Sequence, residues 1–314
     1  MENLSPRIEF YRQRSFSEKM NVVFAFIREN WKPLLKYAFY LLMPVCLVQT
    51  FSMNAFVSTV FNFSFNAATN DSLLGSSMVG FIGNYGIVMF CTMVGSGILS
   101  GLIYAMMQTY AVRPNKLQDV TLNDFRDILV KNFWRYIRLI LAIVFVFLCI
   151  VAIMSLLAAM ISTWTLAITI PVLLVCLIFL IPLMLVVPTY IFERDLTFLN
   201  AVKKAWKLGV ATLGGMLGLM IVLYFISSVI QTITMLPWYL MTIFGSVLSV
   251  ASESTINQSV IYKFVQYILG LIQSFGAYVA TIIGVIGLAF QYFHAREKVE
   301  GVTIESNISN FSEF

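Results

Sequence analysis

The residues that could carry catalysis are few in this 314-residue chain, and their spacing argues against most chemistries. There is a single histidine, His294, which argues against a multi-histidine metal site or a histidine-containing catalytic triad. The four cysteines lie in separate apolar blocks, without the close pairs that metal sites or disulfide frameworks require. We therefore expect no catalytic residue, no cofactor and no metal site, and a protein that is not an enzyme.

Uncharged amides are the polar side chains that remain inside or near the ends of the apolar stretches. Carboxylates are absent from the middle of these stretches, which disfavours proton-coupled transport through a buried acid. Amides in such positions often hydrogen-bond across helices and hold them together. The alternative is a polar groove for a lipid headgroup or a small solute. The candidates for either role are Gln49, Gln108, Gln231 and Gln273.

The composition indicates a lipid environment for the elements that carry these amides. The chain is 60% hydrophobic and only 11% charged, with a mean hydropathy of +0.87, whereas soluble domains carry roughly 25% charged residues. The net charge of +5 does not point to nucleic acid, because the basic residues lie in short segments between apolar blocks rather than along one stripe. We expect the lipid bilayer, and no nucleic acid, as a partner.

The apolar blocks predict an all-α, polytopic integral membrane protein with six transmembrane helices. A spanning helix needs about 20 apolar residues. Residues 73–86 are glycine-rich and are expected to form a poorly helical interfacial segment. Pro237 is expected to end or kink the fifth helix, which leaves 237–250 as an interfacial or re-entrant segment. The expected spans are 34–60, 87–111, 137–161, 166–192, 211–235 and 264–293.

The distribution of Lys and Arg predicts the orientation. Nineteen of the twenty basic residues fall in the N-terminal segment, two connectors and the C-terminal tail, and only Lys263 falls in the alternate connectors. The positive-inside rule places the nineteen in the cytoplasm. The expected organisation is a cytoplasmic segment 1–33, a six-helix domain 34–293 and a cytoplasmic tail 294–314, in a bacterial inner membrane.

Each basic segment resembles the others, with a cap, a short amphipathic helix and then a span. Ser15 with Glu18 reads as a capping box, Thr121 with Asp124 is similar, and Thr197 opens the third segment. We infer a threefold repeat of an amphipathic elbow helix followed by a helical hairpin. Such elbows present cations to anionic lipid headgroups or simply anchor the topology. The candidate lipid contacts are Lys19, Arg28, Lys32, Lys131, Arg135, Lys203, Lys204 and Lys207.

The segment from Pro188 to Leu208, in which a proline and an acidic residue precede an Ala-Val-Lys-Lys-Ala-Trp-Lys-Leu stretch, carries a family resemblance. It resembles the membrane domain of glycerophosphodiester phosphodiesterases and stand-alone bacterial relatives. The opening Arg14-to-Leu35 segment is similar to small Bacteroidota membrane proteins. The resemblance implies the fold and no activity, because the phosphodiesterase activity of fused members belongs to a separate soluble domain.

Two functions remain open from the sequence. The first is a non-enzymatic scaffold, accessory or envelope-maintenance protein with a membrane-protein partner or a second copy of itself. The second is a transporter or lipid-handling protein that uses an uncharged polar groove among repeats. Small-residue patterns at Gly97–Gly101 and Gly214–Gly218 are expected to allow close helix packing.

Overall fold

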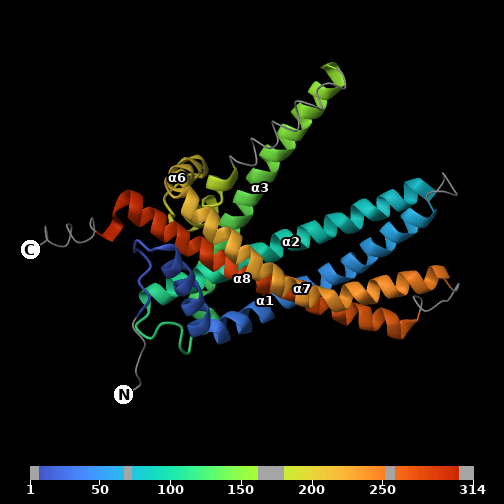
Figure 1. Cartoon of the computed structure of the whole chain (residues 1–314), viewed down its shortest axis with the longest axis horizontal. Coiled ribbons are helices and arrows are strands. Elements are labelled where there is room, and N and C mark those ends of the chain that lie inside the picture. Colours follow the sequence, from blue (N-terminus) through green and yellow to red (C-terminus); the bar gives the residue numbers. More distant parts are fainter. Residues whose placement is uncertain (1–6, 67–72, 162–179, 252–258, 304–314) are drawn as a thin grey trace, which may run out of the picture. The chain divides into compact units, whose positions relative to one another are not determined.

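The computed structural model describes residues 7–66, 73–161, 180–251 and 259–303. The described residues form helices joined by turns, which confirms the all-α expectation (Figure 1). The helices are α1 (Phe16–Asn66), α2 (Leu73–Val112), α3 (Leu122–Ile161), α5 (Val186–Phe192), α6 (Phe198–Ala211), α7 (Leu213–Ala251) and α8 (Val260–Glu300).

Five of these helices are long and apolar enough to cross a membrane, as in a multi-pass membrane protein. They are α1, α2, α3, α7 and α8. The expected span 166–192 lies partly outside the described residues. Its described part, Leu180–Phe192, is a shorter apolar helix interrupted by a turn at Met184 and Leu185. That turn lies between Pro182 and Pro188, where missing backbone donors weaken a continuous helix.

Two segments differ from the sequence expectation. Helix α2 is continuous from Leu73, so residues 73–86 are helical despite their glycines, and α7 continues through Pro237 to Ala251. Where no water competes for backbone groups, a helix satisfies them internally, and this outweighs the weak intrinsic propensities of glycine and proline. The prediction of poorly helical structure at 73–86 is therefore wrong. Of the two alternatives for Pro237, a helix end is wrong, and a kink stays a prediction.

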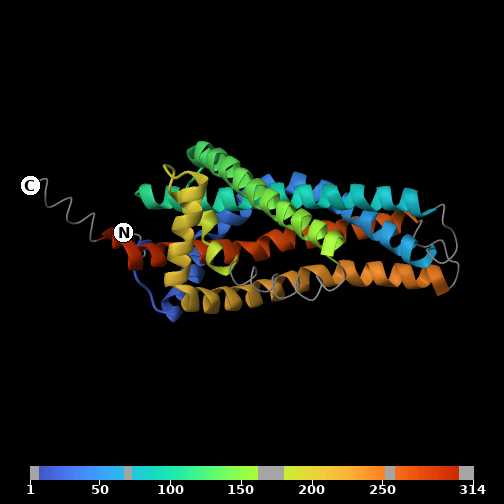
Figure 2. The same cartoon turned by 90° about the horizontal axis from the view of Figure 1, so that it is seen from above.

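The elbows are formed in different ways. In α1 the backbone of Asn30 is non-helical (φ −119°, ψ 15°), and its side-chain amide donates to Phe26 O at 2.9 Å, so the first turns are set off from the rest. Helix α6 ends before Thr212, and Figure 2 shows that it runs across the first turns of α7, which belong to the same unit. By contrast, α3 is one continuous helix from Leu122.

The predicted caps are present at two of the three elbows. Ser15 N donates to Glu18 Oε2 at 2.7 Å, and Glu18 N donates to Ser15 Oγ at 3.4 Å. At α3, Thr121 N donates to Asp124 Oδ2 at 2.7 Å. Thr197 is the N-cap residue of α6, but its side chain makes no capping bond. The threefold repeat remains a prediction.

The chain packs as two compact units. The described residues of Met1–Trp31, Ser100–Leu223 and Ile283–Phe314 form unit 1, and those of Lys32–Leu99 and Tyr224–Ile282 form unit 2. The core of unit 1 is rich in buried aromatic side chains, and the half-buried Phe10 stacks on the buried Phe293 with ring centroids 5.1 Å apart. Unit 2 is held by polar bonds between its helices, which are described below. The expected division into 1–33, 34–293 and 294–314 separates cytoplasmic from membrane-spanning segments, not packing units. It therefore stays a prediction.

Candidate functional site

Glu193 is the centre of a charged cluster in unit 1. It follows the last residue of α5, and its side chain is only 13% exposed. One carboxylate oxygen lies 2.7 Å from the Lys204 ammonium of α6. The other accepts a hydrogen bond of 2.8 Å from the Tyr292 hydroxyl of α8 and lies 3.7 Å from Arg296 Nε. A half-buried carboxylate with two cationic partners and a hydroxyl donor is well compensated for its lost hydration.

The cluster continues along the end of α8 to the N-terminal segment. The ammonium of Lys204 also lies 2.7 Å from Glu300, and Glu300 accepts from Arg296 Nε at 2.8 Å. Arg296 donates in turn to the hydroxyl of Tyr11 at 3.2 Å. Burial raises the pKa of the Tyr11 hydroxyl above its ordinary value, and the nearby Arg296 charge acts in the opposite direction. The network therefore joins four segments of unit 1.

A second ion pair in unit 1 involves Glu29 near the end of the first elbow. Its carboxylate pairs with the Lys116 ammonium of the turn after α2, and it accepts from the Tyr110 hydroxyl at 3.1 Å. Backbone groups of the N-terminal segment close the arrangement, since Ile8 N donates to the Tyr110 hydroxyl at 3.2 Å. Arg7 donates to Tyr110 O at 2.7 Å. Together, these bonds hold the N-terminal segment against the end of α2.

Lys19 is buried, in contrast to the expectation that it contacts lipid headgroups. Its side chain is part of a residue that is only 4% exposed, and its ammonium donates to Gln291 Oε1 at 2.9 Å. Gln291 Nε2 in turn donates to Thr212 Oγ1 at 3.1 Å. The amphipathic pattern of the first elbow places Lys19 among the polar positions. In the structure, however, Lys19 is buried because its ammonium bonds to Gln291, far along the chain.

The other candidate lipid contacts divide into two groups. Lys204 is engaged in the Glu193 cluster, and Arg135 donates to the backbone oxygens of Glu193 and Arg194 at 3.0 and 2.8 Å. The remaining candidates are exposed, and their contact with lipid headgroups stays a prediction. They are Arg28, Lys32, Lys131, Lys203 and Lys207.

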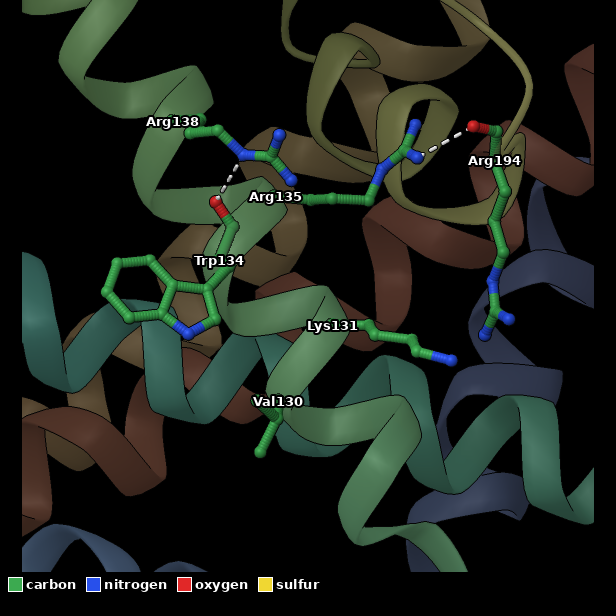
Figure 3. Close-up of a pocket in the computed structure, with 6 residues that line it drawn as sticks. All are labelled: Val130, Lys131, Trp134, Arg135, Arg138 and Arg194. Atoms are coloured by element: carbon green, nitrogen blue, oxygen red, sulfur yellow. Dashed lines mark hydrogen bonds between the residues drawn. The ribbon is translucent and has the colours of Figure 1, made fainter.

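A shallow hollow of about 520 Å³ lies on unit 1 beside the Val130–Arg138 turns of α3. Most of its lining residues come from α3, and Arg194 joins them from the turn after α5 (Figure 3). Four of the six lining side chains are cationic. The lining residues are Val130, Lys131, Trp134, Arg135, Arg138 and Arg194. Sequence reasoning selected Lys131 and Arg135 but missed Arg138 and Arg194, whose shared location depends on tertiary packing.

The four candidate amides have different surroundings. In unit 2, Gln49 Oε1 accepts from the Tyr278 hydroxyl at 2.8 Å, and Gln49 Nε2 donates to Thr92 at 3.2 Å. In unit 1, Gln108 Oε1 accepts from Arg194 at 3.1 Å. Gln231 is exposed, and Gln273 accepts a long bond of 3.4 Å from the adjacent Ser274. Gln49 thus makes the interhelical bonds expected of packing amides.

Further polar bonds join the helices of unit 2. Trp238 Nε1 of α7 donates to Asn54 Oδ1 of α1 at 2.9 Å. The hydroxyls of Thr50 and Ser274 lie 3.0 Å apart between α1 and α8. Close packing in unit 2 also requires a small residue at Gly95, because a Cβ there would lie 2.2 Å from the Tyr278 hydroxyl oxygen. These contacts fix close helix packing without charged groups.

The glycine patterns selected from the sequence are only partly involved in close packing. A Cβ at Gly101 would lie 3.3 Å from the backbone nitrogen of Phe133, so α2 and α3 approach closely there. Gly214 has no such neighbour within 4 Å, and Gly218 has only ordinary contacts with Phe16. Gly95 lies outside both patterns, and its requirement for a small residue depends on Tyr278 far along the chain.

Among the described residues, no group of three or more His, Cys, Asp or Glu side chains could hold a metal ion. The three described cysteines are free, with Cys46 and Cys91 buried and Cys149 exposed, while Cys176 lies outside the described residues. His294 Nδ1 accepts from Arg14 N at 3.0 Å.

No family model, curated protein or solved structure matches this chain. In its described residues the chain is helical, with five long apolar helices. The resemblance to the membrane domain of glycerophosphodiester phosphodiesterases remains a prediction.

Proposed function

We propose that this chain is a non-enzymatic scaffold or accessory protein of a bacterial inner membrane, with six spans and both termini in the cytoplasm. The observation that carries the proposal is the Glu193 cluster. It uses Lys204, Arg296 and Glu300 to tie together connectors that all belong to the basic side of the chain. These charged side chains form ion pairs with one another. Paired charges suit a structural platform for a partner better than a catalytic centre.

The second ion pair supports the same function. Glu29 and Lys116 join the first elbow to the turn after α2, both on the proposed cytoplasmic side. Exposed cations surround this platform and would meet anionic lipid headgroups, where each is worth about 1 kcal/mol. Platform rigidity and lipid attraction together suit a protein that positions a partner at the membrane surface.

Orientation is tested by reporter fusions in the full-length chain. Fusions after Val112 and Lys207 are expected to report the cytoplasm, and fusions near Asp71, Thr163 and Ser254 the exterior. An exterior signal from the fusion after Lys207 would overturn the topology. The fourth proposed span, 166–192, includes residues outside those described. The fusions near Thr163 and after Lys207 flank this span, so opposite signals from the two are decisive for the number of spans.

The platform function is tested by gentle purification followed by native mass spectrometry. A co-purifying membrane protein, or a second copy of the chain, is expected with the wild type. Glu193→Gln is expected to reduce its recovery, because it weakens the ties among the connectors. Glu9→Gln is a matched control, since the Glu9 side chain is 73% exposed and, among the described residues, its one ion pair is with Arg12 at 3.9 Å. Equal recovery with both variants would argue against a platform built on Glu193.

The lipid-handling alternative is supported by the basic hollow beside α3. Changing each candidate amide to leucine separates this function from scaffolding. A transporter that uses a polar groove should lose its deletion-complementing phenotype with Gln49→Leu, Gln108→Leu, Gln231→Leu or Gln273→Leu. A scaffold should keep that phenotype in every variant that folds, because its partner contacts lie elsewhere.

A further inference from the structure

The basic hollow of unit 1 gathers positive charge that the protein itself leaves largely uncompensated. Arg135 donates to two backbone oxygens, Arg194 donates to the neutral Gln108, and Arg138 Nε donates to Trp134 O at 3.2 Å. In the part of the chain that the structure describes, none of the four lining cations forms an ion pair with a carboxylate. Like charges held this close favour an anionic ligand.

The guanidinium groups are positioned by contacts that leave donors available. The Arg135 guanidinium lies 4.2 Å from the centre of the Tyr190 ring, which fixes its plane. Arg135 Nε is buried and has no hydrogen-bond partner among the described residues. Figure 3 shows Arg138 directed toward Arg135, with Lys131 extending toward the side chain of Arg194. Arg138 and Arg194 each make one of these bonds and keep further donors for phosphate oxygens, which can accept two parallel bonds from one Arg, while the fixed Arg135 adds positive charge beside them.

Apolar side chains border the same hollow and continue along α3. Trp134 and Val130 line it while remaining 56% and 44% exposed. Helical spacing places Trp134, Arg138 and Leu141 on one face, and Phe145 one turn further. Leu141 and Phe145 are 51% and 68% exposed. A ligand that reaches from the cations along this face must therefore be charged at one end and apolar at the other.

We propose that this hollow binds one anionic phospholipid, with the headgroup phosphate on Lys131, Arg138 and Arg194 and an acyl chain along Leu141 and Phe145. Arg138 is the last charged residue of α3 before a long charge-free stretch, which puts the hollow at the level where headgroups meet hydrocarbon. Trp134 suits that level as well. The proposal rests on the membrane arrangement proposed above and adds a specific ligand to it.

The test uses the full-length chain purified in an uncharged detergent and native mass spectrometry with added lipid. Phosphatidylglycerol and phosphatidylcholine with identical acyl chains are compared, because they differ in net charge but not in apolar length. The first phosphatidylglycerol is expected to bind the wild type roughly 10-fold more tightly than phosphatidylcholine. The double variant K131Q/R138Q is expected to lose most of that preference.

The control variant R126Q/K298Q removes one Arg and one Lys charge from exposed positions that do not line the hollow. It is expected to keep the preference for phosphatidylglycerol. An equal loss in both double variants, or no preference in the wild type, would overturn the proposal in favour of diffuse charge attraction. If K131Q/R138Q fails to fold, R138Q alone is measured and is expected to show the same direction of change.

Inorganic phosphate distinguishes a lipid from a free anion. Excess phosphate is expected to leave the first phosphatidylglycerol bound, because it cannot use the apolar face of α3. Displacement of the lipid by phosphate alone would assign the hollow to a soluble anion and overturn the lipid proposal. If the reporter fusions contradict the proposed orientation but the protein still prefers phosphatidylglycerol, the orientation is rejected and the phospholipid site is kept. The failure of one proposal is therefore distinguishable from the failure of the other.

Discussion

The Lys204 ammonium lies 2.7 Å from the Glu193 carboxylate, and the two residues come from different elements of unit 1. Glu193→Gln removes the negative charge while keeping the side-chain size. We expect the apparent unfolding temperature in detergent to fall, with a loss of about 1.5–3 kcal/mol, which is typical of hydrogen bonds to charged groups. Glu9→Gln should change it little, because exposed ion pairs contribute little. Equal apparent unfolding temperatures of the Glu193→Gln and Glu9→Gln variants would contradict the structural role of Glu193.

Gly95 provides a sharper test of packing in unit 2. A Cβ there would lie 2.2 Å from the Tyr278 hydroxyl oxygen, so Gly95→Ala must displace Tyr278 or separate α2 from α8. Overpacking of this kind costs about 1–3 kcal/mol. Gly83→Ala is the matched control in the same helix, since no atom lies within 4 Å of its added Cβ. Thermal unfolding should separate the two variants, and a stable Gly95→Ala protein would refute the tight contact.

The elbow caps predict a difference between two similar substitutions. Ser15→Ala removes a hydrogen-bonded cap and should destabilise the first elbow by about 1 kcal/mol. Thr197→Ala should have a smaller effect, because the Thr197 side chain makes no capping bond. Hydrogen exchange of the first turn of each helix measures both effects directly. A larger opening of α6 than of α1 would count against this assignment.

Asn132 predicts a stabilising change. The residue is 1% exposed, and both polar atoms of its side chain lack a hydrogen-bond partner among the described residues. An unsatisfied buried amide costs about 1–3 kcal/mol, so Asn132→Leu, which keeps a similar volume, should raise the apparent unfolding temperature. A fall in that temperature would mean that the amide contributes favourably to the folded state.

Features that depend on neighbouring residues could be predicted from the sequence. The capping box at Ser15 and Glu18 is present, and long charge-free stretches mark the five helices that could cross a membrane. These patterns are short in range, so the chain itself specifies them. The helix at 73–86 was missed because propensities measured in water underweight backbone satisfaction in lipid.

The site could be predicted only in part, because its partners are distant in the chain. Lys19 reads as an exposed cation of an amphipathic helix, yet its partner Gln291 lies 272 residues away. Arg194 similarly joins Lys131 and Arg135 in the hollow only because the turn after α5 packs beside α3. Such pairings require the tertiary structure, whereas the local pattern indicated only that cations gather on one side.

The exposed apolar turns of α3 also affect how the protein can be handled outside a cell. Most large side chains from Leu141 to Leu156 are exposed, including Phe145 and Phe147. In solution these side chains form an apolar surface that detergent must cover. Without detergent, the chains would aggregate through this surface. A fluorophore attached at Cys149, which is exposed on this helix, would register that self-association before turbidity becomes visible.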